Sequence, residues 1–244
     1  MKRVVEIILV VIVAFLIYYI AMLIYTPLQF EKELTERSKT VVEKLKDIRS
    51  AERFYKGKYG KFTDNFDTLI NFVLYDSVKM ERKLVDEDDS VAMAQLKKAG
   101  KKNIEEYYES ALDVVFAPKK LTEQEVRDLR YIPYNAEQKE FHLAAGEAVT
   151  GSTMVLPTVE CYALYPDFLN YVEYKQEIIN LIDLATEEKK IPIGVDKDGK
   201  TVYSAGLKFG SLESNNNENG NWGEEFESSL SDIVRSTSGS GHIF

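Results

Sequence analysis

Hydrophobic and polar residues change their pattern abruptly after the first thirty residues of the chain. The nineteen residues from Ile7 to Tyr25 carry no charge, and as a helix they span roughly 28 Å, about the thickness of a bilayer's hydrocarbon core. This run predicts a transmembrane anchor. A cleaved signal peptide is the alternative, but the run is long for one and does not end in a pattern of small residues. Lys2 and Arg3 precede it, so the positive-inside rule places the N-terminus in the cytoplasm and the bulk of the chain outside.

A second periodic pattern follows Pro27, which is expected to kink a continuous helix or to restart one. Apolar residues recur there at helical spacing between charged faces and predict a spine helix over residues 28–56. Gly57 and Gly60 are expected to end it, because glycine tolerates the left-handed conformation at a helix C-terminus. The apolar stripe consists of Phe30, Leu34, Val41, Leu45, Ile48 and Tyr55, with Val42, Ala51 and Phe54 beside it.

A short second helix is expected next, capped by Thr63 or Asp64. Its inward face is predicted to consist of Phe66, Leu69, Ile70 and Val73. Residues 76–130 are rich in Lys and Glu and predict a mostly helical insertion, with a strand at 77–85 and helices at 90–100, 104–116 and 122–129. Thr122 and Glu125 form a capping box at the start of the last helix.

Short alternating runs then predict an antiparallel sheet. Strands are expected at 130–133, 139–147, 154–164, 191–195 and 201–209, and helices at 166–170 and 175–188. Asp196-Lys-Asp-Gly199 is expected to be a hairpin turn rather than a calcium loop. The predicted fold class is α+β: a long N-terminal helix, transmembrane plus spine, packed on an antiparallel β-sheet head with a helical insertion.

The pattern therefore predicts five parts. They are an anchor at 1–27, the spine and a short clasp helix at 28–75, the insertion at 76–130, a β-rich head at 131–223 with its helix at 175–188, and a short helix with a flexible tail at 224–244.

Composition narrows the classes of function. The net charge of -9 argues against a nucleic-acid partner. Cys161 is the single cysteine and excludes an intrachain disulfide or a multi-cysteine zinc site, while His142 and His242 are too few for a histidine-based metal centre. We interpret Cys161 as a small buried hydrophobic residue and His142 as a residue on the polar face of its strand. Nucleophile elbows, paired His/Cys ligands and phosphate loops are missing from the sequence, which predicts a non-enzymatic protein without a cofactor.

An Asn-rich segment near the end of the head closes on the single tryptophan, Trp222. Because Asn permits tight turns and left-handed backbone, we expect an ordinary turn that Trp222 anchors against the sheet. The less favoured alternative is a calcium loop. Its oxygen ligands would come from Asn215, Asn217, Glu218 and Asn221.

Glu6 places a carboxylate at the start of the apolar run, where it is unfavourable unless it reaches the interface or finds a partner. Counted without Met1, it is the fifth residue. The segment thus resembles type IV pilins and type II secretion pseudopilins, which have a hydrophobic N-terminal helix with a glutamate at the fifth mature position.

The spine strengthens this resemblance. The pattern Leu45-x-x-Ile48-x-x-Ala51-x-x-x-Tyr55, then Gly-x-Tyr or Gly-x-Phe, then Asp-x-Leu, is similar to the pseudopilin spine and the loop after it. With Tyr-Ile-Pro-Tyr at 131–134, Phe-x-Leu-x-Ala-Gly-Glu at 141–147 and Gly-Leu-Lys-Phe-Gly-Ser at 206–211, the chain up to Trp222 also resembles an uncharacterised pilin-like family of single-pass membrane proteins.

The resemblance implies a structural subunit of a type IV pilus or a type II secretion system. It would associate with itself or with related pilin-like subunits through the N-terminal helix, as a single-pass protein of the inner (cytoplasmic) membrane with a periplasmic bulk, or in a periplasmic or extracellular filament. Assembly roles are implied for Glu6, Pro27, Leu34 and Val41, and head-packing roles for Leu45, Ile48, Ala51, Tyr55, Leu69 and Trp222.

Two alternatives remain open. The residues before Glu6 include no glycine, where the family pattern has a leader ending in one. This departure favours an anchored periplasmic binding or scaffold module that does not polymerise. An anchored enzyme is the third and least favoured hypothesis.

Overall fold

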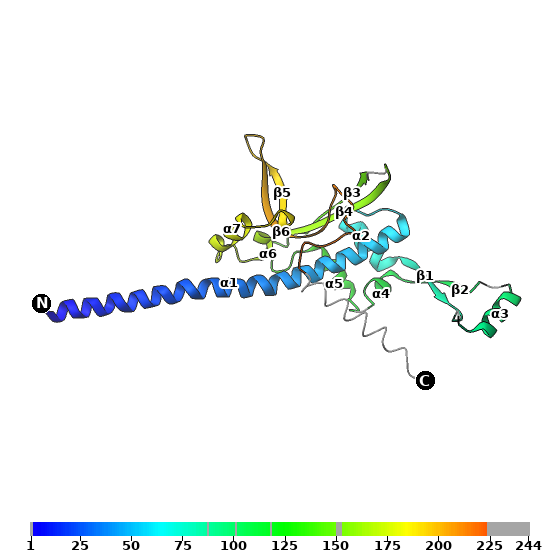
Figure 1. The fold of residues 1–244 in the computed structure, drawn as a ribbon, viewed down its shortest axis with the longest axis horizontal. Helices are drawn as coiled ribbons and strands as arrows, with labels where there is room; N and C mark the ends of the chain where they lie inside the picture. The colour runs from blue at the N-terminus through cyan, green and yellow to red at the C-terminus, as the bar shows by residue number, and fades with distance from the viewer. Residues whose placement is uncertain (1, 87, 101, 118, 150–152, 224–244) are drawn as a thin grey trace. The chain divides into compact units, whose positions relative to one another are not determined.

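The computed structural model describes residues 2–86, 88–100, 102–117, 119–149 and 153–223, and it has the predicted α+β class, with a long N-terminal helix and antiparallel sheets (Figure 1). The described residues form two compact units. Unit 1 takes residues 2–43, 132–139 and 163–207, and unit 2 takes residues 44–131, 140–162 and 208–223. The short helix and tail predicted over 224–244 lie outside the described residues.

Helix α1 extends from Lys2 to Tyr59 as one helix of 58 residues and continues through Pro27. A restart at Pro27 was one of the two predicted outcomes, and it does not occur. Proline removes one helical hydrogen bond, and the good helix-forming residues that follow it, such as Leu28, Gln29 and Glu31, keep the next turns intact. The helix ends before Gly60, which has a φ of +75° and donates its N–H to the Lys56 carbonyl at 2.8 Å. Gly57 lies inside the helix, so its prediction as a stop is wrong.

Helix α2 covers Phe66–Tyr75, and its predicted inward residues are all buried. The predicted caps are wrong, because Asn65 is the N-cap and its side chain accepts a hydrogen bond from the Thr68 N–H at 3.1 Å. The Thr63 hydroxyl instead accepts from the Asn65 N–H at 3.2 Å. The turn between α1 and α2 therefore has a hydrogen-bond pattern that the sequence alone did not reveal.

The insertion contains a two-stranded ribbon, β1 (Ser77–Lys83) and β2 (Ile104–Ser110), which pair antiparallel. The helix predicted over 104–116 is therefore wrong in its first half, since only α4 (Ala111–Val115) is helical. Glutamates favour a helix locally, but pairing with β1 decides the conformation. The remaining helical elements are α3 (Ser90–Lys98), α5 (Glu123–Arg127) with the predicted capping box, and η1 (Asp128–Arg130).

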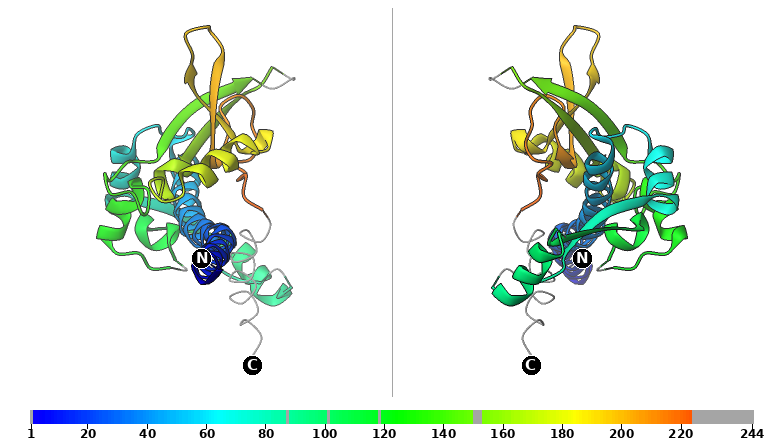
Figure 2. Two further views of the ribbon diagram at one scale, coloured as in Figure 1. Left: turned by 90° about the vertical axis from the view of Figure 1, so that its left-hand side faces the viewer. Right: turned by 90° about the vertical axis from the view of Figure 1, so that its right-hand side faces the viewer.

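The larger sheet has four strands in the order β3-β4-β6-β5. These are β3 (His142–Val149), β4 (Val155–Leu164), β5 (Lys190–Val195) and β6 (Thr201–Gly210). β3 and β4 pair antiparallel, with His142 opposite Tyr162, and Figure 2 shows these two green strands side by side. The strand predicted at 130–133 is reduced to one bridge between Tyr131 and Glu140.

Unit 1 contains the remaining short elements. They are α6 (Tyr165–Phe168), α7 (Lys175–Asp183) and η2 (Glu187–Lys189). The helix predicted at 175–188 therefore ends five residues early. The predicted turn between β5 and β6 is confirmed, because the Asp196 carboxylate accepts hydrogen bonds from the N–H groups of Asp198 and Lys200, both at 2.9 Å.

Candidate functional site: the N-terminal helix and its joint with the head

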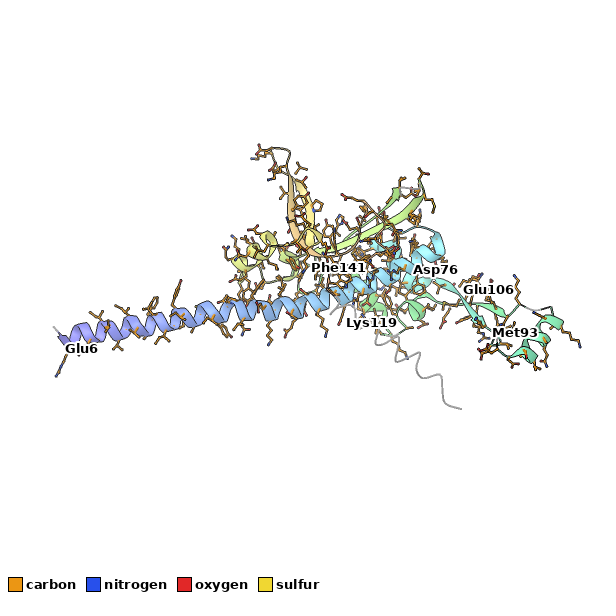
Figure 3. The ribbon with its side chains drawn as sticks, viewed as in Figure 1. Glu6, Asp76, Met93, Glu106, Lys119 and Phe141 are labelled. Atoms are coloured by element: carbon orange, nitrogen blue, oxygen red, sulfur yellow. The ribbon has the colours of Figure 1, made fainter. Side chains whose placement is uncertain are left out.

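The first half of α1 exposes apolar residues on all sides. Every described large apolar side chain from Ile7 to Tyr25 is at least 47% exposed, and the most apolar 18-residue window has a mean hydropathy of 3.2. Among the described residues, α1 is the one helix long and apolar enough to cross a membrane, a property that membrane anchors and signal sequences share. Glu6 lies exposed at the far end of this segment (Figure 3).

The four predicted assembly residues do not share one surface. Glu6 and Pro27 are exposed, Leu34 is half-buried and Val41 is fully buried. Burial along the helix begins at Phe30. Val41 therefore packs inside its own chain and is not available to an exposed assembly surface.

Polar contacts within unit 1 hold α1 just after the apolar run. Arg37 donates to the Phe168 carbonyl at 2.7 Å, and the Glu33 carboxylate accepts from the Asn170 N–H at 3.0 Å. Arg37 and Glu33 also form an ion pair at 3.2 Å. This cluster was not predicted from the sequence, where its only local signal is the i,i+4 spacing of opposite charges.

Unit 2 contains the joint, which we define as the second half of α1 from Lys44, helix α2, and the Asn-rich loop at 211–222. All six residues with predicted head-packing roles are buried here, at 8% exposure or less. Aromatic contact continues the packing into α2, with the Tyr55 ring edge-on to Phe72 at a centroid distance of 5.4 Å. The stripe predicted from spacing is thus the buried face of the helix.

Glu52 is a carboxylate inside this joint, with no exposed surface. One oxygen accepts a hydrogen bond from the Thr63 N–H at 3.2 Å, and the other has no hydrogen-bond partner among the described residues. Burial raises the pKa of Glu52 to about 8, although the bond from Thr63 opposes the shift. The burial of Glu52 was not predicted from the sequence, where the available signal was its position one turn after Ile48 on the buried stripe.

Basic side chains on α1 hold the Asn-rich loop. Arg53 and Lys56 donate to the Glu218 carboxylate at 3.1 and 3.5 Å, and Arg53 also donates to the Asn217 carbonyl at 2.8 Å. The Arg49 guanidinium lies 5.4 Å from the centre of the buried Trp222 ring. Trp222 therefore contacts α1, whereas the loop meets the sheet through the bridge between Phe209 and Gly220.

The loop uses the predicted calcium ligands for protein contacts. The Glu218 carboxylate is paired with Arg53 and Lys56. The Asn215 side chain accepts from the Asn217 N–H at 3.0 Å, and the Asn221 side chain accepts from the Lys208 N–H at 2.9 Å. Within the described residues, no group of three or more His, Cys, Asp or Glu is placed to hold a metal ion.

A shallow hollow of about 510 Å³ lies between the end of α1 and α2. Asp76 at its rim accepts hydrogen bonds from Lys58 and Tyr59, and the bond from Lys58 is the main cause that lowers the pKa of Asp76 to about 2. The hollow offers aromatic faces and hydrogen-bonding groups. Its lining consists of Tyr55, Tyr59, Thr68, Asn71, Phe72, Tyr75 and Asp76.

A second hollow of about 280 Å³ includes Asp67, Arg130, Glu140 and His142. Arg130 is ion-paired with both acids at 2.8 Å, and the exposed His142 ring stacks on Tyr162 at 4.4 Å. Cys161 is fully buried, and burial raises the pKa of its thiol well above the usual range. These contacts stabilise the fold.

The chain was compared with protein-family models, with curated proteins and with solved structures, and none of them matches it.

Proposed function

We propose that this protein is a membrane-anchored, non-enzymatic structural subunit, similar to a pilin or pseudopilin, that assembles through its N-terminal helix. The observation that carries the proposal is the division of α1 into two halves. The half before Phe30 is apolar and exposed on all sides, whereas the half after Val41 buries one face in the protein.

A helix that is apolar all round needs lipid or other helices around it. Exposed apolar surface costs about 25 cal/mol per Å² in water, which makes a solvated form of this segment very unfavourable. A cleaved signal peptide also explains an exposed apolar segment. The continuity of α1 into the buried joint supports retention, because the two halves form one helix without a break between them.

The charges around the segment support one orientation. Lys2 and Arg3 precede it, and Glu31, Lys32 and Glu33 follow it. We place the N-terminus in the cytoplasm and the head in the periplasm, as a single-pass protein of the inner membrane. Neighbouring copies, or related subunits, would then meet through their membrane helices.

Glu6 is the residue that would set the register of these helices. A carboxylate in an apolar environment is tolerated only where it finds a partner, and the N-terminal amine of a neighbouring helix is a partner of suitable charge. Glu6 is exposed, so we expect its replacement to leave the fold of the head unchanged. A loss of assembly in a Glu6 variant can then be assigned to the missing carboxylate and not to unfolding.

The test is electron microscopy of membranes extracted with mild detergent, comparing Glu6→Ala with the wild type. We expect ordered filaments or rings from the wild type and their loss in Glu6→Ala, with an unchanged thermal unfolding midpoint of the head. Glu31→Ala, which removes an exposed carboxylate beyond the apolar run, is the matched control and should assemble normally. Normal assembly of Glu6→Ala would overturn the mechanism.

A second candidate is an anchored periplasmic scaffold that does not polymerise. The β1–β2 ribbon and α3 favour it, because they project most of their side chains into solvent, as a partner-binding arm would. Discrete particles in the same images would favour this candidate. Mass spectrometry of the natural N-terminus tests the retained anchor that both candidates require. Loss of at most Met1 would support the anchor, and cleavage near Ala21 would show that the mature protein lacks it.

A further inference from the structure

The ribbon formed by β1 and β2 is a sheet of two strands, and within the described residues neither outer edge pairs with another strand. Six of the seven residues of β2 are exposed, and so are four of the seven residues of β1. Tyr108 is 72% exposed and Ile104 is 49% exposed. An isolated two-stranded ribbon is only marginally stable in water, so this one would gain stability from an additional strand.

The hydrogen bonds at the two ends of the ribbon show which backbone groups point outward. The Ala111 N–H donates to the Asp76 carbonyl at 3.0 Å, and the Leu84 N–H donates to the Asn103 carbonyl at 3.3 Å. Both pairs continue the register of the ribbon. Because hydrogen-bonded and non-hydrogen-bonded pairs alternate in an antiparallel ladder, the pairs in between can be assigned.

The assignment leaves open donors and acceptors on both edges. On β1, the open outward N–H and C=O groups belong to Lys79 and Glu81, whereas at the start of the strand the Ser77 N–H donates to the Asp76 carboxylate and the Ser77 carbonyl accepts from Lys58, both at 2.8 Å. On β2, the outward groups belong to Ile104, Glu106, Tyr108 and Ser110. The strand residues among these are the non-hydrogen-bonded partners of the ribbon register. The middle of each edge is therefore ready to accept a strand.

The two edges carry opposite charge. β1 has three basic residues and one acid, whereas β2 has three glutamates and no basic residue. Inside the ribbon, the basic strand already pairs with the acidic one, with Lys79 and Glu106 at 2.6 Å and Arg82 and Glu105 at 2.5 Å. A β1 edge beside a second β1 edge would place like charges opposite each other, and so would two β2 edges.

We propose that the ribbon is a head-to-tail contact between copies of this chain, in which the β2 edge of one copy pairs with the β1 edge of the next. Repeating the order β1-β2-β1-β2 keeps every neighbouring pair antiparallel and every basic strand beside an acidic one. Such a contact is heterologous and does not close on itself, so it extends into an open chain. The lysines of β1 discourage pairing with a second β1 edge, which is also basic. They favour pairing with the β2 edge, because that edge is acidic.

The contact goes beyond the function proposed above, because it uses residues of the insertion and is independent of the N-terminal helix. Its test is sedimentation velocity of the full chain in detergent at low salt, with proline placed on one edge at a time. All variants carry Glu6→Ala, which removes assembly through the N-terminal helix, and the chain without a proline substitution serves as the wild-type ribbon. Glu81→Pro removes an outward N–H from β1, and Tyr108→Pro removes one from β2, while the hydrogen bonds inside the ribbon stay intact.

We expect the wild type to form species larger than one copy that dissociate in high salt, and each proline variant alone to lose them. A mixture of the two proline variants should form a one-to-one complex, because each variant keeps the edge that the other has lost. Glu81→Ala and Tyr108→Ala keep their N–H groups and should associate like the wild type. A wild type that stays a single copy, or a Glu81→Pro variant that pairs with itself, would overturn the proposal.

A cross-linking measurement covers the case in which a proline unfolds the ribbon. Lys79 and Tyr108 are opposite each other in the register, so they also lie at the same height along a continued sheet. Lys79→Cys and Tyr108→Cys are mixed and oxidised, and the buried Cys161 stays out of reach. We expect several-fold more disulfide between the two variants than within either one; equal amounts of the three products would contradict the head-to-tail contact.

Discussion

The Glu52 carboxylate accepts a hydrogen bond from the Thr63 N–H at 3.2 Å and thereby ties the end of α1 to the turn before α2. The bond lies within the joint, where Glu52 is fully buried. Asp64 and Cys161 are the titratable groups that interact with this carboxylate. The free energy of unfolding therefore depends on whether Glu52 is protonated, because burial disfavours its charged form.

The first prediction concerns pH. Glu52 has a pKa of about 8 in the folded protein, against 4.5 for a free glutamate, so between these values the folded state binds more protons than the unfolded state. The free energy of unfolding should fall as the pH rises from 4.5 to 8 and level off above 8, with a loss on the order of several kcal/mol. Urea unfolding across this range measures it.

Glu52→Gln should remove most of this pH dependence. The amide oxygen can still accept from Thr63, and the amide N–H₂ adds a constant cost of about 1–3 kcal/mol without titrating. Glu43→Gln, an exposed position on the same helix, is the control and should follow the wild type. An unchanged slope in Glu52→Gln would assign the pH dependence to another group.

The second prediction compares two glycines. A Cβ on Gly210 would lie 1.9 Å from the Val159 carbonyl oxygen, and the φ of Gly210 is +76°. Gly210→Ala should therefore lower the free energy of unfolding by about 2 kcal/mol or more. Gly57→Ala has open space around it inside α1 and should raise stability by about 0.5–1 kcal/mol. Guanidinium unfolding of both variants checks the contrast, and effects of equal sign would contradict it.

The third prediction uses Trp222 as a fluorescent reporter of the Asn-rich loop. Glu218→Arg replaces the partner of Arg53 and Lys56 with a like charge and should destabilise the docked loop by about 1–3 kcal/mol. We expect the emission of Trp222 to shift to longer wavelength while the far-ultraviolet circular dichroism is retained. Glu213→Arg makes the same charge change at an exposed position of the loop and should leave the spectrum unchanged; a shift of equal size there would point to net charge instead.

The fourth prediction concerns Cys161. Its thiol is fully buried, and burial raises its pKa well above the usual range, so the reactive thiolate is scarce. Iodoacetamide at pH 8 should label the native protein very slowly and the urea-unfolded protein completely, as read by mass spectrometry. A Tyr108→Cys variant adds an exposed thiol and should be labelled once, rapidly. Fast labelling of Cys161 in the native state would show that the core opens.

Patterns within one element predicted the features that depend on neighbours in sequence. The spacing of Leu45, Ile48 and Ala51 predicted the buried face of α1, and the Thr122 and Glu125 pair predicted the start of α5. These predictions succeed because helical periodicity and capping act over a few residues.

Features decided by distant segments were missed. Residues 104–110 form a strand because β1 lies opposite them, and Glu52 is a buried acid because the chain before α2 folds over it. Glu218, a ligand in the less favoured alternative of a calcium loop, has a carboxylate that pairs with basic residues more than 160 positions earlier in the chain. Local propensity contains no information about such partners.

The sequence by itself determined the apolar run at the N-terminus, the amphipathic spine that continues it and the α+β class, because each follows from local composition and periodicity. The tertiary structure alone decided that both helical segments are one helix across Pro27, that Val41 is buried rather than available for assembly, and that the ribbon presents two open edges of opposite charge. These properties depend on which surfaces are covered and which strands are paired, and covering and pairing are interactions between residues that are far apart in the chain.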